Sequence, residues 1–373
     1  MRRSQKENII HDLKKKIVFL VGPRQVGKTW LAKDIINDFK QAVYLNYDSY
    51  EDRDIIKRQA WLPSNELIVL DELHKMPDWK NYLKGVFDTK PESLQILVTG
   101  SARLDIARQA GDSLAGRFFV HHLFPFTINE LFSVKQQSLL PQLYERGGFP
   151  EPFLSDHPED VQRWRHFYTD SLIRTDVLEF QRIQNIKQIQ MVFDMLRRRV
   201  GSPVSYKSIA EDIQIAPNSV KRYIDVLEAL YIVFRITPYS RNIERSLLKE
   251  PKIYFFDHGL VESGEGSRFE NIMALEFFRY AKVRRDLTGI SADLHYLRTK
   301  DGREVDFCYT EDHIAKAFIE TKVQETEPDK NLKYFHGKYS IPAYQLVQHN
   351  RQERISQGIQ IRNAESFFQT IDL

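Results

Sequence analysis

A glycine-rich segment near the start of the chain has the residue types and the spacing that bind phosphate. Residues 22–29 follow the pattern Gly-x-x-x-x-Gly-Lys-Thr. In such a loop, glycines let backbone N–H groups close around phosphate oxygens, and the helix that follows adds a favourable dipole. Lys28 would contact the β- and γ-phosphates of a nucleotide, and the hydroxyl of Thr29 would hold a magnesium ion. The alternative is a glycine-rich turn with an exposed lysine. The residues expected to bind the nucleotide are Gly22, Pro23, Arg24, Gln25, Val26, Gly27, Lys28, Thr29 and Trp30.

Two adjacent acids, Asp71 and Glu72, complete the predicted chemistry of this site. They follow four apolar residues at 67–70, a pattern typical of a buried strand whose carboxyl end carries acids. Ligands of open parallel sheets bind at that edge. We expect Asp71 to hold magnesium through water, and Glu72 to polarise the attacking water as the general base. An acidic turn after a strand has the same pattern, and the upstream loop favours the catalytic interpretation.

Residues at the end of the next apolar strand pattern, at 94–98, are candidates for contact with the γ-phosphate. Ser101 is the first candidate, because a polar side chain there would lie between the acids and the phosphates, and Thr99 is the second. Arg117 or Arg103 could act as an arginine finger, from within the chain or from a neighbouring subunit of a homo-oligomer. An ordinary surface arginine explains either position equally well.

A second group of charged residues lies in the last third of the chain. Strand side chains alternate between two faces. In the two predicted strands that flank a turn near Asp312, odd-numbered positions are mostly apolar, whereas Asp306, Glu320 and Lys322 fall on the even-numbered face. Two carboxylates with water suit Mg²⁺ or Mn²⁺, and Lys322 could orient or activate the water that attacks a phosphodiester. The alternative is a solvated ion pair on a half-exposed sheet.

The phosphate-binding residues need a strand before the loop and a helix after it. The apolar run at 16–21 predicts a buried strand, and residues 30–36 predict the helix. Further strands are expected at 42–48, 66–72 and 94–101. The sequence therefore predicts an α/β fold in which a parallel sheet positions the phosphate loop and the acids.

The middle of the chain has a different pattern. Residues 141–199 favour helices, and two shorter helices are expected at 205–213 and 219–231. Strands at 232–238 and 252–257 would then flank a basic turn that contains Arg241, Arg245 and Lys249. A helix–turn–helix followed by a hairpin indicates a winged helix.

Three polar residues on the second of those helices are candidates for contact with DNA. Asn218, Lys221 and Arg222 are expected to face outward, where they could contact phosphates or bases. A winged helix used only for packing between domains is the alternative.

Composition sets the limits of these interpretations. The chain has 373 residues, and its 54 Lys+Arg against 51 Asp+Glu give a net charge of +3, so any basic surface must be local. The single cysteine, Cys308, excludes an intrachain disulfide and a cysteine-based zinc site. Neither a signal peptide nor an apolar run of membrane-spanning length is evident. We expect two or three domains in a cytoplasmic protein that has no membrane partner.

The motifs together resemble a known family. The segments 22–29, 67–72, 99–102, 114–117 and 123–127 are similar to those of the AAA-type ATPases of bacteria and archaea that are fused to domain of unknown function 4143. The resemblance extends in order over essentially the whole chain. It implies ATP as the nucleotide, and no guanine-reading Asn-Lys-x-Asp segment stands out.

The C-terminal residues carry a second resemblance. Asp306, followed by Glu320-Thr321-Lys322, resembles the Asp…Glu-x-Lys core of restriction-endonuclease-like nucleases. In that pattern a helix upstream supplies another acid. Glu270 on the apolar helical segment 269–278 is the best match, and Glu276 is the runner-up. The resemblance implies metal-dependent DNA cleavage.

These observations predict three domains: a P-loop AAA-type ATPase at 1–140, a helical and winged-helix domain at 141–260, and a nuclease-like domain at 261–373. The predicted function is an ATPase that acts on DNA, with ATP and Mg²⁺ as cofactors and Mn²⁺ as the alternative metal of the second site. The alternative is an ATP-driven switch that regulates a protein partner and has a non-catalytic nuclease-like fold. A transcription regulator that uses the winged helix is a third hypothesis. The predicted catalytic residues are Glu72, Lys28, Ser101, Glu270, Asp306, Glu320 and Lys322.

Overall fold

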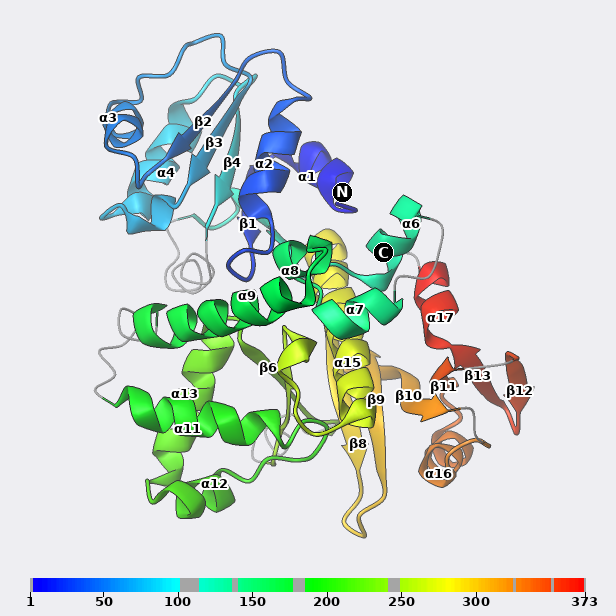
Figure 1. Ribbon diagram of the computed structural model, residues 1–373. Coiled ribbons are helices and arrows are strands. Elements are labelled where there is room, and N and C mark those ends of the chain that lie inside the picture. Colours follow the sequence, from blue (N-terminus) through cyan, green and yellow to red (C-terminus); the bar gives the residue numbers. More distant parts are fainter. Residues whose placement is uncertain are drawn as a thin grey trace. The chain divides into compact units, whose positions relative to one another are not determined.

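The computed structural model describes residues 3–100, 114–135, 140–176, 185–240, 249–324, 327–349 and 352–371. These residues fall into two units, Met1–Phe124 and Pro125–Leu373, which Figure 1 colours from blue to cyan and from green to red. The division into three domains predicted above stays a prediction.

Five short strands form the sheet of the first unit. Apolar, fully buried segments such as Ile-Val-Phe-Leu-Val favour strands that are covered on both faces. Neighbouring strands run parallel in the order β2-β3-β4-β1-β5. Parallel pairing brings the carboxyl ends of these strands to one edge of the sheet, which is where a ligand is expected. The strands are β1 (Ile17–Val21), β2 (Ala42–Asn46), β3 (Leu67–Asp71), β4 (Gln95–Thr99) and β5 (Phe118–His122).

Helices cover both faces of this sheet. Val18, Leu20 and Leu31 belong to the apolar cluster on one face, and Phe19 and Trp79 belong to the cluster on the other. The helices of this unit are α1 (Lys6–Leu13), α2 (Lys28–Ile36), α3 (Tyr50–Arg58), the 3₁₀ turn η1 (Leu73–Lys75) and α4 (Trp79–Thr89).

The second unit begins with helices and continues into a large mixed sheet. The sheet has the strand order β12-β13-β11-β10-β9-β8-β6-β7. Its helical segments are α6 (Ile128–Lys135), α7 (Leu140–Arg146), α8 (Pro150–Leu154), α9 (Pro158–Ser171), η2 (Leu172–Asp176), α11 (Ile186–Arg197), α12 (Tyr206–Ile213), α13 (Pro217–Ala229), η3 (His258–Leu260), α15 (Glu265–Thr288), α16 (Lys330–Tyr339) and α17 (Ala364–Thr370). Its strands are β6 (Val233–Pro238), β7 (Lys252–Phe255), β8 (Ala292–Arg298), β9 (Glu304–Glu311), β10 (Ile314–Gln324), β11 (Ala343–His349), β12 (Arg354–Ser356) and β13 (Ile359–Asn363).

The long helix α15 packs against one face of this sheet (Figure 1). Its apolar side chains are buried, and Phe277 lies against Phe307 of β9. The helix ends at Gly289, whose φ of +75° is a left-handed conformation that glycine adopts without strain. Helix α16 packs on β9 and β10, and its Phe335 shares an apolar cluster with Cys308 and Phe318, so these two even-numbered strand positions also face a core.

The sequence predicted most of these elements within a few residues. The strand before the phosphate loop, the helix after it and the two strands that end in Asp71 and Thr99 are confirmed. The two middle helices and the two strands that follow them are confirmed as well. None of the helices that the structure describes has the length and apolar character needed to span a membrane.

Candidate functional site

The phosphate loop links β1 to α2 and has the backbone conformation that its glycines predict. Gly22 and Gly27 have φ values of +145° and +97°. A Cβ atom at Gly22 would lie 2.1 Å from the carbonyl oxygen of Leu123, so no side chain fits at that position. The Nζ atom of Lys28 donates to the carbonyl oxygens of Gly22 at 3.0 Å and Pro23 at 2.5 Å. Burial lowers the pKa of Lys28 to about 8, a shift that nearby phosphate charge would oppose.

Asp71, at the carboxyl end of β3, lies next to this loop. Its Oδ2 atom accepts a hydrogen bond from the Thr29 hydroxyl at 3.1 Å. The hydroxyls of Tyr44 and Thr99 also donate to the carboxylate, each at 2.5 Å. The predicted Thr29–Asp71 pair is therefore in contact. A hydroxyl beside a carboxylate at the start of a phosphate-binding helix is a donor set that suits magnesium.

Tyr44 was not among the residues that the sequence marked. It lies on β2, which neighbours β3, and burial raises the pKa of its hydroxyl. Asn46 pairs with Asp71 in the strand register, and Tyr44 lies two residues before Asn46. Because residues two apart on a strand share a face, Tyr44 lies on the same face of the sheet as Asn46 and Asp71. This alternation of faces was the signal in the sequence for Tyr44. It identifies Tyr44 as a partner of Asp71 only once the order of the strands is known.

Glu72, the predicted general base, follows Asp71 in a left-handed conformation with φ of +56°. Its carboxylate lies 3.4 Å from the Nζ atom of Lys75 and 3.7 Å from Nε2 of His74. Lys75 also pairs with Asp48 at 2.5 Å. Lys75 and His74 thus lie against the carboxylate of Glu72, whose catalytic role stays a prediction.

The predicted γ-phosphate contacts are only partly described. Ser101 and Arg103 lie outside the described residues. Thr99, the second candidate, donates to Asp71 and is fully buried. Arg117 forms two hydrogen bonds with Asp88, at 2.8 Å and 3.2 Å, so in this structure it belongs to a surface ion pair.

In the second unit, the strand pairing brings the predicted acids together. Ile319 pairs with Phe307 in the β9–β10 register, so Asp306 lies opposite Glu320, and the N–H of Asp306 donates to the Glu320 carboxylate at 3.3 Å. Lys322 donates to Glu320 at 2.7 Å. Burial, followed by the charge of Asp306, raises the pKa of Glu320 well above its usual range.

One buried lysine at this cluster was missed by the sequence analysis. The Nζ atom of Lys252, on β7, lies 2.8 Å from Glu304, 3.2 Å from Glu270 and 3.6 Å from Asp306. Its side chain is 1% exposed. Burial alone would lower the pKa of Lys252, but the three carboxylates raise it above its ordinary value. A charged residue inside the apolar strand Lys-Ile-Tyr-Phe was the available signal.

The two helix acids have different surroundings. Glu270 contacts Lys252 and accepts a hydrogen bond from Tyr254 at 2.7 Å, and burial raises its pKa to about 7. Glu276, the runner-up, instead accepts from the N–H of Ile128 at 2.9 Å, at the start of α6. Within the described residues, no group of three or more His, Cys, Asp or Glu side chains is arranged to hold a metal ion.

The middle helices present the predicted polar face. Asn218, Lys221 and Arg222 on α13 are exposed. Strands β6 and β7 pair antiparallel, and β6 also pairs with β8, so this hairpin forms one edge of the large sheet. Arg241 and Arg245 of the predicted basic turn lie outside the described residues.

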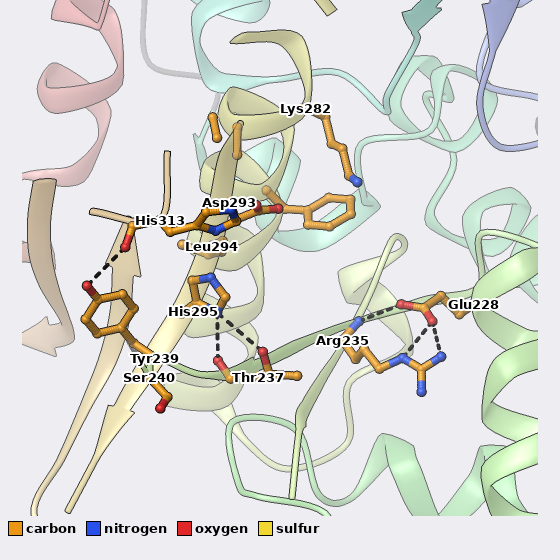
Figure 2. Close-up of a pocket in the computed structure, with 13 residues that line it drawn as sticks. Glu228, Arg235, Thr237, Tyr239, Ser240, Lys282, Asp293, Leu294, His295 and His313 are labelled. Atoms are coloured by element: carbon orange, nitrogen blue, oxygen red, sulfur yellow. Dashed lines mark hydrogen bonds and ion pairs between the residues drawn. The ribbon is translucent and has the colours of Figure 1, made fainter. Parts of the chain in front are cut away.

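A pocket of about 320 Å³ lies beside β6, β8 and α15, and its lining includes none of the predicted site residues. Figure 2 shows His295 against Thr237, and Arg235 against Glu228. Nδ1 of His295 lies 3.3 Å from both the carbonyl and the hydroxyl oxygen of Thr237, and burial lowers the pKa of the ring. Arg235 is neutralised by Glu228 and Asp225. Four lining residues of this pocket, Glu228, Arg235, Thr237 and His295, therefore interact with one another in pairs.

Family models match three consecutive segments of the chain. Residues 14–132 match an AAA domain, residues 137–267 match a domain of unknown function (DUF8612), and residues 265–367 match a domain of unknown function (DUF4143). The first match contains the phosphate loop, Asp71 and Glu72, and the third contains Glu270, Asp306 and Glu320.

Relatives and solved structures align with this chain at low identity. An uncharacterized protein of Mycobacterium tuberculosis is 28% identical over 304 residues, which cover 78% of this chain and 66% of that protein, just under two thirds of its length. An uncharacterized protein of Methanocaldococcus jannaschii is 23% identical over 356 residues, covering 86% of this chain and 78% of that one. The Walker-type ATPase of Pyrococcus abyssi aligns over 70% of this chain and 95% of its own, with a TM-score of 0.46 and 14% identity.

The matches to an AAA domain and to DUF4143 support the expected fusion of these two domains. The α/β fold of the first unit, with its parallel sheet and phosphate loop, resembles that of P-loop NTPases, and residues 14–132 match the AAA domain. The chain joins an AAA domain to a DUF4143 domain.

Proposed function

We propose that the first unit binds Mg-ATP and hydrolyses it. The observation that carries this proposal is the contact between the Thr29 hydroxyl and the Asp71 carboxylate, beside a loop that has no room for a side chain at Gly22. Backbone N–H groups of the loop would bind the phosphates. Lys28 would exchange the carbonyls of Gly22 and Pro23 for phosphate oxygens.

The remaining residues supply the chemistry around the phosphates. Thr29 and Asp71 would hold magnesium, which neutralises phosphate charge when it is bound. Glu72 would accept the proton of the attacking water, and Thr99, with Ser101, would sense the γ-phosphate. An arginine finger, either Arg117 or Arg103, from within the chain or from a neighbouring subunit, would complete this set.

Replacement of Lys28 tests the ATPase proposal. The variant Lys28→Ala should lose ATP binding and hydrolysis, because it lacks the ammonium group that would contact the β- and γ-phosphates. Titration of the full chain with a fluorescent ATP analogue measures the affinity, and phosphate release measures hydrolysis. Lys57→Ala, an exposed lysine on α3, is the matched control. Unchanged ATP affinity in Lys28→Ala would overturn the proposal, and parallel titration with GTP tests the choice of base.

For the second unit, two candidate roles differ in whether its acids hold a metal. One role is a metal-dependent nuclease that acts on DNA, in which Asp306 and Glu320 hold Mg²⁺ or Mn²⁺ and Lys322 orients the water. The proximity of these three side chains supports it, and the exposed Asn218, Lys221 and Arg222 would make the middle helices a DNA-contacting winged helix.

The other role is an ATP-driven switch that regulates a protein partner through a non-catalytic nuclease-like fold. It is favoured by the internal partners of Asp306: Oδ2 accepts from the N–H and hydroxyl of Thr321, at 2.9 Å and 2.7 Å, and Oδ1 faces Lys252. A nuclease would nick supercoiled plasmid with Mg²⁺ or Mn²⁺ and lose that activity in Asp306→Asn. If the plasmid is not nicked and DNA does not change the ATPase rate, the nuclease role is excluded and the role as a switch remains.

A further inference from the structure

The buried charges of the second unit centre on Lys252. Three carboxylates on two other elements surround its ammonium group: Glu270 on α15, and Glu304 and Asp306 on β9. Tyr254, on the same strand as Lys252, donates to the Glu270 oxygen that faces the ammonium. The cation is therefore shared by acids that lie far from it in sequence.

The backbone holds Lys252 in this position. Residue 252 pairs with Ile236 of β6 and forms an isolated bridge with Pro203 on its other side. The N–H of Val204 donates to the carbonyl of Pro251 at 2.8 Å. The ammonium also lies 5.5 Å from the ring centre of Tyr296, which closes the apolar side of its environment. A strand fixed on both sides gives the ammonium little freedom to withdraw.

The acids are held as firmly as the cation. Glu270 packs against Gly201, where a Cβ atom would lie 2.5 Å from its carboxylate. Glu304 also pairs with Arg298 at 2.9 Å, and Asp306 accepts from Thr321. An ammonium within 4 Å of all three carboxylates repels a divalent ion strongly at this depth. Divalent ions also need oxygens at about 2.0 to 2.6 Å, and Lys252 fills the space between these oxygens.

We infer that Lys252 takes the position in the Glu270–Glu304–Asp306 cluster that a divalent metal would hold in a nuclease. The protein itself supplies a cation to the cluster, and its acids pair with Lys252 without metal. The residues present do not fit the metal that the nuclease resemblance implies, so no cleavage step is assigned to them. This inference goes beyond the ATPase proposal and does not depend on it.

Lys252 and the acids that it contacts lie in segments that match two different family models. Lys252 belongs to the segment that matches DUF8612, whereas all three acids belong to the segment that matches DUF4143. The ammonium that contacts all three acids of this cluster is therefore supplied by the segment that precedes the DUF4143 match. Loss of that contact would expose the cluster to solvent cations.

Direct measurement of Mn²⁺ binding tests the inference. The full chain carrying Asp71→Asn, which weakens metal binding at the nucleotide site, is titrated with Mn²⁺ without nucleotide, and free Mn²⁺ is followed by electron paramagnetic resonance. With Lys252 present, we expect no Mn²⁺ site that depends on Asp306. Adding Lys252→Met should create one site per chain, with binding at least about tenfold tighter, and Asp306→Asn should remove that gain.

Thermal unfolding provides the second readout. Lys252→Met should lower the midpoint by about 10 °C, because it leaves buried acids without their cation, and Mn²⁺ should recover part of this loss. The control Lys249→Met removes an exposed lysine three residues away and should change neither measurement. One Mn²⁺ bound per chain in the presence of Lys252, and lost on Asp306→Asn, would overturn the inference. That titration needs no Lys252 variant, so the inference stays testable if Lys252→Met does not fold.

Discussion

Each unit of this protein surrounds an aspartate with hydrogen-bond or ion-pair partners, and the nature of the partners differs. Around Asp71, the donors are the neutral hydroxyls of Thr29, Tyr44 and Thr99 and the N–H of Glu72. Around Asp306, they include the ammonium of Lys252. Hydroxyl donors orient a carboxylate and leave its negative charge available to a cation, whereas an ammonium cancels that charge. The same residue type is thus prepared for a metal in one unit and for an internal ion pair in the other.

Replacement of the acid next to each aspartate should give the largest contrast. Glu72→Gln should lower the rate of ATP hydrolysis roughly 10²- to 10⁴-fold, because it removes the general base while keeping the shape of the side chain. Glu320→Gln should leave the ATPase rate unchanged. Steady-state phosphate release checks both variants. Equal rates in Glu72→Gln and the unmodified chain would remove Glu72 from the chemistry.

The aspartates themselves provide the next contrast. Asp71→Asn should reduce hydrolysis roughly 10- to 100-fold, as expected for a group that holds magnesium through water. The loss should be smaller at high Mg²⁺ concentration, which a titration of rate against Mg²⁺ would reveal. A rate loss that stays constant at every Mg²⁺ concentration would contradict a role in metal binding.

Asp306→Asn should act on stability and not on hydrolysis. We expect the free energy of unfolding to fall by about 1 to 3 kcal/mol, because Lys252 keeps two of its three carboxylates. Denaturant unfolding measures the change, and Asp156→Asn, an exposed acid, is the control. A stability loss that appears only after chelation of divalent ions would indicate a metal at this cluster and would break the comparison.

Tyr44→Phe should have the smallest effect. Asp71 retains the hydroxyls of Thr29 and Thr99, so stability should change by about 1 kcal/mol and the apparent Mg²⁺ affinity by less than roughly tenfold. The same denaturant and Mg²⁺ titrations apply. A rate loss as large as that of Asp71→Asn would mean that Tyr44 takes a direct part in the chemistry.

Local pattern was enough to predict the nucleotide site. The phosphate loop is a contiguous segment, and the strand before it and the helix after it are its immediate neighbours. Asp71 needed one further step, since the carboxyl ends of parallel strands share an edge. The adjacency of Asp306 and Glu320 was predictable for a different reason, because the two residues lie on antiparallel strands joined by a short turn.

The sequence by itself determined the elements of both units and the residues that adjoin one another along the chain or across a hairpin. Only the tertiary structure decided which donors meet each aspartate. Tyr44 comes from a strand 27 positions before Asp71, and Lys252 reaches β9 because the sheet places β6 and β7 beside β8. Strand order is set by packing over the whole sheet, and no local pattern carries it. The charge of the second acid cluster, and with it the fit of a metal there, therefore depends on the fold.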